Sequence, residues 1–175
     1  MLVLLNKFLP SEYVKSIFEI QPKLLKDNGI KGIITDLDNT LVAWDVKIAT
    51  DDVIDWFDMI QDAGIKITII SNNNEERVKT FSEPLNIPFI ASAKKPFKKS
   101  FKQAAKQMGL AREEVAVIGD QLLTDVFGGN RAGLHTILVA PIVQTDAKIT
   151  TFNRKIERKI LNYFRKKGRI TWEEE

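Results

Sequence analysis

Apolar runs alternate along the chain with segments of helical spacing, and this alternation predicts an α/β domain built on a parallel sheet. The apolar runs are rich in Ile and Val, which is typical of strands covered on both faces. We predict five such strands, over 30–36, 65–71, 87–91, 115–120 and 135–140. The sheet is therefore expected to be mainly parallel, with helices on its two faces.

The segments between these strands place apolar side chains on one stripe at helical spacing. They predict helices over 51–63, 75–82 and 97–108. Thr50 is a suitable N-cap for the first of these helices, and Gly64 follows its end. Two further helices are predicted over 11–28 and 151–167. No repeat or flexible linker interrupts the pattern, so we expect a single domain over 1–175 with a core of about 30–140.

Composition narrows the chemistry that this domain can perform. The 175 residues contain no Cys and one His, which excludes disulfide scaffolds, thiol nucleophiles and multi-histidine metal sites. The apolar opening of the chain is too short for a spanning helix and lacks the layout of a signal peptide, so we expect a cytoplasmic protein. The net charge is +3, but residues 150–169 alone carry eight basic side chains and one acid. The basic character therefore belongs to the predicted C-terminal helix.

Chemically active side chains follow four of the predicted strands. They are Asp36, Asp38 and Thr40 after the first strand, Ser71 and Asn72 after the second, Lys95 after the third, and Asp120 and Asp125 after the fourth. Ligands of open parallel sheets bind at the carboxyl ends of the strands, so we expect these residues to converge. Gathered carboxylates repel each other, so they are tolerated only if a cation neutralises them or one of them holds a proton. Asp36 and Asp120 supply oxygen ligands that suit Mg²⁺, and Asp38 suits an acid/base partner to a nucleophile at Asp36.

This ordered set resembles the four motifs of the haloacid dehalogenase superfamily. The motifs span residues 36–125, and the predicted strands extend the likeness over about 30–140. The DLDNTL opening and the Ser-Asn-Asn turn are most similar to the capless subfamily IIIA, which includes YqeG-like proteins and phosphatidylglycerophosphate phosphatases. The resemblance implies a Rossmann-like, three-layer fold with a mainly parallel five-stranded sheet and no sizeable cap domain.

The resemblance further implies a Mg²⁺-dependent phosphatase that acts through an aspartyl-phosphate intermediate. Asp36 would attack phosphorus, Asp38 would be the general acid and base, and Lys95 would balance the negative charge. The substrate phosphate would be bound by Thr40, Ser71 and Asn72. Mg²⁺ would be held by Asp36, the backbone carbonyl of Asp38, and Asp120, with Asp125 either a ligand or a residue that orients one.

The expected substrate is large, because the chain has little room for a lid. Only 30 residues separate Thr40 from Ser71, and 23 separate Ser71 from Lys95. An open site cannot easily enclose a small molecule. A phosphorylated substrate with its own extended surface is the natural inference. The alternative is a small soluble phosphate ester enclosed by a lid from another subunit; the sequence does not determine the oligomeric state.

The predicted helix over 151–167 has a basic face and an apolar stripe. The stripe comprises Phe152, Ile156, Ile160 and Phe164. A helix of this kind can lie on an anionic membrane. Together with the subfamily resemblance, this favours a phospholipid such as phosphatidylglycerophosphate as the substrate. It also favours a peripheral position of the protein at the inner face of the membrane. A helix of this kind is more often docked on its own domain through the stripe, with its basic face in solvent. A non-catalytic binding module that uses this helix is a further alternative, although nucleic acid is not an expected partner.

Overall fold

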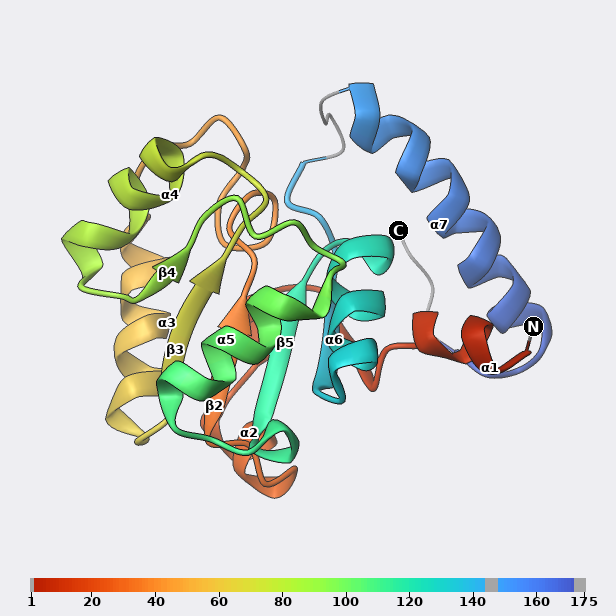
Figure 1. Cartoon of the computed structure of the whole chain (residues 1–175), viewed down its shortest axis with the longest axis horizontal. Helices are drawn as coiled ribbons and strands as arrows, with labels where there is room; N and C mark the ends of the chain where they lie inside the picture. The colour runs from red at the N-terminus through yellow and green to blue at the C-terminus, as the bar shows by residue number, and fades with distance from the viewer. Residues whose placement is uncertain (1, 144–147, 172–175) are drawn as a thin grey trace.

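The structure is a computed structural model that describes residues 2–143 and 148–171. Within these residues, six strands form one central sheet (Figure 1). They are β1 (Glu12–Val14), β2 (Gly32–Thr35), β3 (Lys66–Ile70), β4 (Phe89–Ile90), β5 (Val115–Gly119) and β6 (His135–Val139). Their order is β1-β6-β5-β2-β3-β4, and each neighbouring pair is parallel. The chain builds outward from β2 in one direction and from β5 in the other, so the crevice between these two strands is where a ligand site is expected.

The prediction of five strands was wrong, because a sixth strand, β1, lies near the N-terminus. The prediction of one helix over 11–28 was wrong for the same segment. This segment contains β1, a short 3-10 turn at Ile17–Glu19 and α2 (Pro22–Asp27). Pro22 lacks an N–H and cannot lie inside a helix, but it fits the first turn of α2. Tyr13 and Val14 favour a strand, and β1 pairs with β6 at the edge of the sheet. The mainly parallel α/β architecture itself is confirmed.

The three helices predicted between the strands are confirmed within a residue of their bounds. They are α3 (Asp51–Asp62), α4 (Glu75–Ser82) and α5 (Lys98–Met108). Thr50 caps α3 as expected, because its Oγ1 accepts a hydrogen bond from the Val53 N–H. The short α1 (Leu2–Leu5) and α6 (Phe127–Ala132) were not predicted. Helix α6 contains Gly128 and Gly129, which are poor helix formers, but a Cβ at Gly128 would collide with Phe101 of α5. The glycine permits the two helices to approach closely.

Alternate side chains of the strands point to opposite faces of the sheet and build two apolar layers. Ile33 and Ile69 join a cluster with buried side chains of α3 and α4, whereas Ile34 and Ile70 join a cluster with those of α5. Figure 1 shows α5 and α6 in front of the sheet and α3 behind it. This three-layer arrangement has no large inserted cap in the part of the chain that the structure describes.

The predicted C-terminal helix is present as α7 (Lys148–Lys166) and docks on the domain. Leu161 and Phe164 are buried, and they belong to an apolar cluster with Leu122, Val126 and Leu138. Of the predicted stripe, Phe164 is buried, Ile156 and Ile160 are partly buried, and the side chain of Phe152 lies outside the described residues. The C-terminal part of the stripe therefore packs on the domain. No helix in residues 2–143 and 148–171 is both long and apolar enough to cross a bilayer.

Candidate active site

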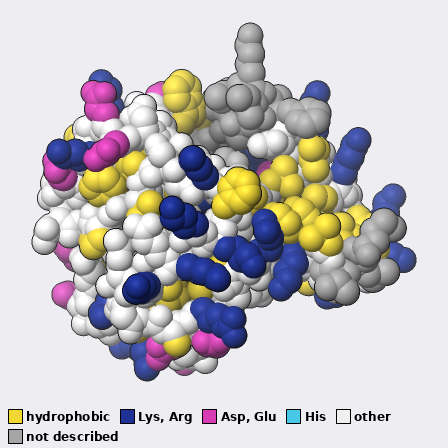
Figure 2. Space-filling view, in the orientation of Figure 1, with side chains coloured by type: hydrophobic (Ala, Val, Ile, Leu, Met, Phe, Trp, Pro, Cys, Tyr) yellow, Lys and Arg dark blue, Asp and Glu magenta, His cyan; other side chains and the backbone are white. Residues whose placement is uncertain are grey.

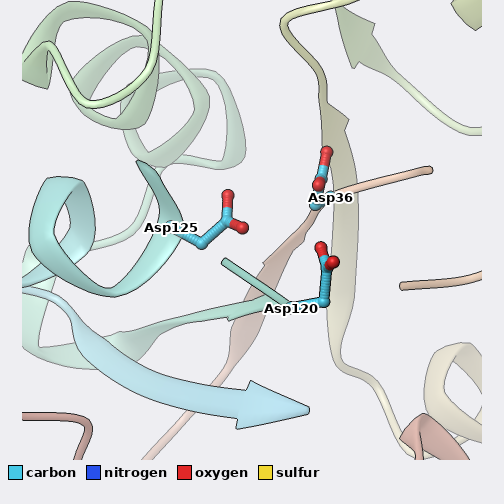
Figure 3. Close-up of side chains that lie close together, drawn as sticks. All are labelled: Asp36, Asp120 and Asp125. Carbon is cyan, nitrogen blue, oxygen red and sulfur yellow. The ribbon is translucent and has the colours of Figure 1, made fainter. Parts of the chain in front are cut away.

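Three carboxylates converge at the carboxyl ends of β2 and β5 (Figure 3). Asp36 follows β2, Asp120 follows β5, and Asp125 lies in the π-helical turn Leu122–Val126. Because β2 and β5 are parallel neighbours, Asp36 and Asp120 follow strands that end at the same edge of the sheet. The Asp36 N–H donates a hydrogen bond to the Ile118 carbonyl at 2.9 Å. All three side chains are buried, and each offers an oxygen within 4.8 Å of the others. The convergence expected from the sequence is therefore realised for these three residues.

Lys95 lies between two of these carboxylates. Its ammonium is 2.8 Å from Asp36 Oδ1 and 2.7 Å from Asp125 Oδ1, with 2% of the Lys95 side chain exposed. Burial alone would lower the pKa of Lys95, but the two carboxylates outweigh burial and hold the pKa above its ordinary value. Burial raises the pKa of Asp36 to about 6, against the opposing effect of the ammonium. Lys95 is thus a fixed positive charge beside Asp36.

The backbone of Lys95 is fixed by Asn72. The Asn72 Oδ1 accepts a hydrogen bond from the Lys95 N–H at 2.7 Å, and its Nδ2 donates to the Lys95 carbonyl at 3.2 Å. The Ala93 N–H also donates to the Ser71 carbonyl at 2.9 Å. The loop after β3 therefore holds the loop that carries Lys95. Ser71 is buried beside this contact, and its Oγ accepts a hydrogen bond from the Asn73 N–H at 3.1 Å.

Asp120 has a protein partner on each carboxylate oxygen. Thr40 Oγ1 donates to its Oδ1 at 3.1 Å. Its Oδ2 is in contact with the guanidinium of Arg154 from α7, which also donates to the Asp120 carbonyl at 2.7 Å. Burial raises the pKa of Asp120 to about 7, although Arg154 opposes the shift. The structure therefore places Thr40 and Arg154 around the expected metal ligand.

Asp38 is held by Arg77 of α4 and by Asn73, and it is not part of the three-carboxylate cluster. Its Oδ1 accepts hydrogen bonds from Arg77 Nη2 at 2.8 Å and Nε at 3.1 Å, and its Oδ2 accepts one from Asn73 at 3.1 Å. The turn that separates Asp38 from Thr40 contains Asn39 with a φ of 64°, a left-handed conformation that Asn tolerates. The side chain is partly exposed at the opening of the site. This orientation suits a group that exchanges protons with substrate rather than one that belongs to the buried cluster.

Asp125 reaches the cluster because Gly119 ends β5. The Asp125 Oδ2 accepts a hydrogen bond from the Gln121 N–H at 3.1 Å, while its Oδ1 faces Lys95. A Cβ on Gly119 would overlap the Asp125 carboxylate. The absence of a side chain at this position is therefore a requirement of the site.

We expect Gly119→Ala to displace Asp125 and release Lys95 from its bridging position. The variant should lose about 2 kcal/mol of unfolding free energy, because the added methyl group forces the carboxylate to move within a closely packed region. Urea unfolding followed by circular dichroism measures this change. Gly64→Ala is a suitable comparison, because no atom lies within 4 Å of a Cβ there and only its φ of 81° is unfavourable. Equal stability losses in the two variants would contradict the role given to Gly119.

The donor set fits a divalent metal ion. Three buried carboxylates face two cationic side chains, Lys95 and Arg154, so negative charge is in excess. The raised pKa values of Asp36 and Asp120 reflect the cost of burying that charge. A hard cation such as Mg²⁺ prefers these oxygen ligands and would supply the missing positive charge.

Two arginines at the site had no signal in the sequence. Arg77 and Arg154 lie on helices, and they are 39 and 34 residues away in sequence from the aspartates that they contact. Each lies among other charged residues of its helix, so local spacing does not distinguish it from a solvated side chain. Only the packing of α4 and α7 brings them to the site.

Comparisons with known proteins agree with this geometry. A family model described as HAD-hydrolase-like matches residues 92–166. The protein of Bacillus subtilis strain 168 named "Probable phosphatase YqeG" is 59% identical over 167 residues, which cover 95% of this chain and 97% of that protein. The Arabidopsis thaliana protein named "Phosphatidylglycerophosphate phosphatase 1, chloroplastic/mitochondrial" is 25% identical over 170 residues, covering 91% of this chain and 49% of that protein. This chain thus spans about half the length of the plant protein.

A solved structure shares the fold. The cobalt-bound deoxy-D-mannose-octulosonate 8-phosphate phosphatase of Haemophilus influenzae superimposes with a TM-score of 0.56 at 21% sequence identity. The match covers 78% of this chain and 90% of that one. At this level of identity the likeness concerns the architecture alone.

Proposed function

Because this chain belongs to the phosphatases of the haloacid dehalogenase superfamily, we propose that it hydrolyses phosphate monoesters with Asp36 as the nucleophile and Mg²⁺ as the cofactor. The observation that carries the proposal is the buried cluster of Asp36, Asp120 and Asp125 around Lys95. A structural ion-pair network does not require three carboxylates at the crevice where ligands of this fold bind. A nucleophile that meets a dianionic phosphate does require nearby positive charge.

The reaction has two displacement steps at phosphorus. Asp36 forms a bond from a carboxylate oxygen to phosphorus as the ester oxygen leaves, and Asp38 gives that oxygen a proton. Water then attacks the aspartyl phosphate and gives its proton to Asp38, which releases inorganic phosphate and restores Asp36. Arg77 and Asn73 hold Asp38 at the opening, where leaving group and water would pass.

Some of the buried charged residues are proposed to bind the metal ion, and the others to support the nucleophile. We assign Asp36, Asp120 and the backbone carbonyl of Asp38 as the ligands of Mg²⁺, which when bound neutralises phosphate charge and orients it for attack. Asp125 has its two oxygens on Lys95 and Gln121, so its proposed role is to position Lys95 rather than to ligate the metal. Lys95 stabilises the negative charge shared by Asp36 and the phosphoryl group.

The phosphate-binding residues act in two ways in this proposal. Ser71 lies at the end of β3, where its hydroxyl and the following backbone amides can bind phosphoryl oxygens. Thr40 and Asn72 contact Asp120 and the Lys95 backbone instead. We therefore propose that these two support phosphate binding by holding the charged groups in place.

Exposed apolar side chains in the segments that follow the site residues support a large, amphipathic substrate, and we call them the apolar rim. Trp44 and Ile48 follow β2 and are 52% and 65% exposed, Phe97 follows Lys95 and is 65% exposed, and Ile142 follows β6 and is 50% exposed. The Ile142 N–H donates to the Asn39 carbonyl, which ties its loop to the turn after Asp36. Apolar side chains that gather around an open site indicate contact with an apolar surface. A phospholipid monoester has such a surface beside its phosphate.

A basic surface lies on α5, which begins directly after Phe97. Figure 2 shows Lys and Arg side chains gathered on the face that α5 and α6 cover. On α5 the exposed basic residues are Lys98, Lys99, Lys102 and Lys106. Anionic headgroups attract such a surface. We therefore propose a peripheral position at the inner face of a membrane, with the apolar rim and α5 toward the lipid, in place of contact through the apolar stripe of α7, whose Phe164 is buried in the domain.

The substrate proposal is tested by comparing phosphate release from phosphatidylglycerophosphate in mixed micelles with release from soluble sugar phosphates, with and without Mg²⁺. Lipid preference, loss of activity in EDTA and no activity in Asp36→Asn are the expected results. Equal turnover of soluble esters would contradict the lipid assignment while leaving the reaction intact. Retention of activity in EDTA would contradict the metal dependence.

The rim has its own test in the double variant Trp44→Ser, Phe97→Ser. Lipid turnover should fall about tenfold, because each exposed aromatic loses its contact with the apolar surface, and turnover of a soluble ester should stay within about twofold. Tyr163→Ser is a matched control, since this aromatic residue is 38% exposed on α7. A parallel fall on both substrates would show that the rim acts on the site itself and not on lipid binding.

A further inference from the structure

Helix α7 places a positively charged side chain, the guanidinium of Arg154, at the proposed metal site. Arg154 Nη2 contacts Asp120 Oδ2, and its Nη1 donates to the Asp120 carbonyl at 2.7 Å. The Asp120 side chain is fully buried, whereas Arg154 is 18% exposed and reaches it from the surface. Because Thr40 Oγ1 donates to the other oxygen, both oxygens of Asp120 have protein partners in this arrangement.

A guanidinium and a divalent cation are competitors for one buried carboxylate. Each neutralises the same negative charge, and the two positive charges repel each other strongly at a separation of a few ångströms in a poorly solvated site. A metal bound by Asp120 therefore weakens the attraction between Asp120 and Arg154. In turn, Arg154 raises the energetic cost of metal binding.

The rest of α7 is anchored independently of this contact. Glu157 is buried, and its Oε1 accepts a hydrogen bond from the Leu123 N–H at 2.9 Å. Its Oε2 lies 3.3 Å from Arg154 Nη1, so the arginine has an anionic partner on its own helix when it leaves Asp120. Leu161 and Phe164 pack in the apolar cluster further along the helix. Release of Arg154 therefore affects the first turns of α7 and leaves the helix attached.

We propose that Arg154 and the divalent cation compete for Asp120, so that Arg154 sets the metal affinity of the site and the first turns of α7 respond to metal occupancy. Arg154 is in this sense a positioning residue that acts through Asp120. The inference rests on the proposed metal site, but it concerns a residue outside the four motifs. It also links the basic C-terminal helix to catalysis through the metal.

The test measures Mn²⁺ binding to the whole protein by electron paramagnetic resonance, without substrate. Arg154→Met should lower the dissociation constant of Mn²⁺ by about tenfold or more, because it removes the competing charge. Arg158→Met is the matched control. It removes the same charge from an exposed position one turn along α7, so its dissociation constant should change by less than about twofold.

A second measurement uses the unmodified chain and does not depend on how the variants fold. Hydrogen exchange of peptides from the first turns of α7 should become faster when Mg²⁺ is added, whereas exchange in α3 should not change. Slower exchange in α7, or unchanged Mn²⁺ affinity in Arg154→Met, would overturn the competition. If the unmodified protein and both variants fail to bind Mn²⁺, the proposed metal site fails together with the inference.

Discussion

Asp36→Asn is expected to reduce phosphatase activity by roughly ten-thousand-fold, because an amide cannot form the aspartyl phosphate. The substitution should not lower the unfolding free energy by more than about 1 kcal/mol, because burial already disfavours the charged carboxylate and raises its pKa to about 6. Mg²⁺-dependent phosphate release and urea unfolding measure the two quantities on the same preparation.

Asp58→Asn is the control for this variant. It makes the same chemical change on an exposed position of α3, so it should leave both activity and stability unchanged. Activity of Asp36→Asn within tenfold of the original chain would rule out nucleophilic catalysis by Asp36. Loss of activity accompanied by unfolding would instead make Asp36 a structural requirement, and the mechanism would lose its main support.

Lys95→Met has the largest expected effect on stability. The ammonium is within 2.8 Å of the carboxylates of Asp36 and Asp125, and both of them are buried. Removal of one partner from a buried ion pair typically costs about 3–5 kcal/mol, because the remaining charge is left without compensation. For a chain of this size the melting temperature should fall by about 10 °C. Thermal unfolding in EDTA measures the change without compensation from a metal.

The neighbouring residue provides the comparison for Lys95. Lys94 is exposed, so Lys94→Met should change the melting temperature by little and leave phosphate release intact. A Lys95→Met variant as stable as Lys94→Met would mean that Asp36 and Asp125 do not depend on the ammonium. In that case Lys95 would contribute only to binding the phosphate.

Much of the fold was predictable because its determinants are local. Runs of Ile and Val mark the buried strands, and the amphipathic spacing of α3, α4 and α5 marks the helices between them. The errors have equally local causes. Pro22 interrupts the helix predicted over 11–28, because it fits only the first turn of a helix. Gly128 and Gly129 have low helix propensity, so the sequence of α6 does not indicate the helix that packing against α5 requires.

The convergence at the site was predictable for a topological reason. Parallel strands end at one edge, so polar residues that follow strands meet even when they are far apart in sequence. That rule brings Asp36, Asp120 and Lys95 together. It says nothing about the direction in which side chains turn after the strand, which is why the contact of Thr40 with Asp120 and that of Asn72 with Lys95 could not be foreseen.

The π-helical turn at Leu122–Val126 limits how this sequence can change in length. Each residue of a helix rotates the following side chains by a large angle about the axis, about 100° in an α-helix and less in a wider π-helical turn. One inserted or deleted residue between Asp120 and Asp125 would therefore keep a helix but turn the second carboxylate away from Lys95. Substitutions at the two partly exposed positions of the turn, Leu123 and Thr124, are compatible with the site as long as the interval is kept. The number of residues between Asp120 and Asp125 is therefore a stricter requirement of the site than the identity of the side chains at these two positions.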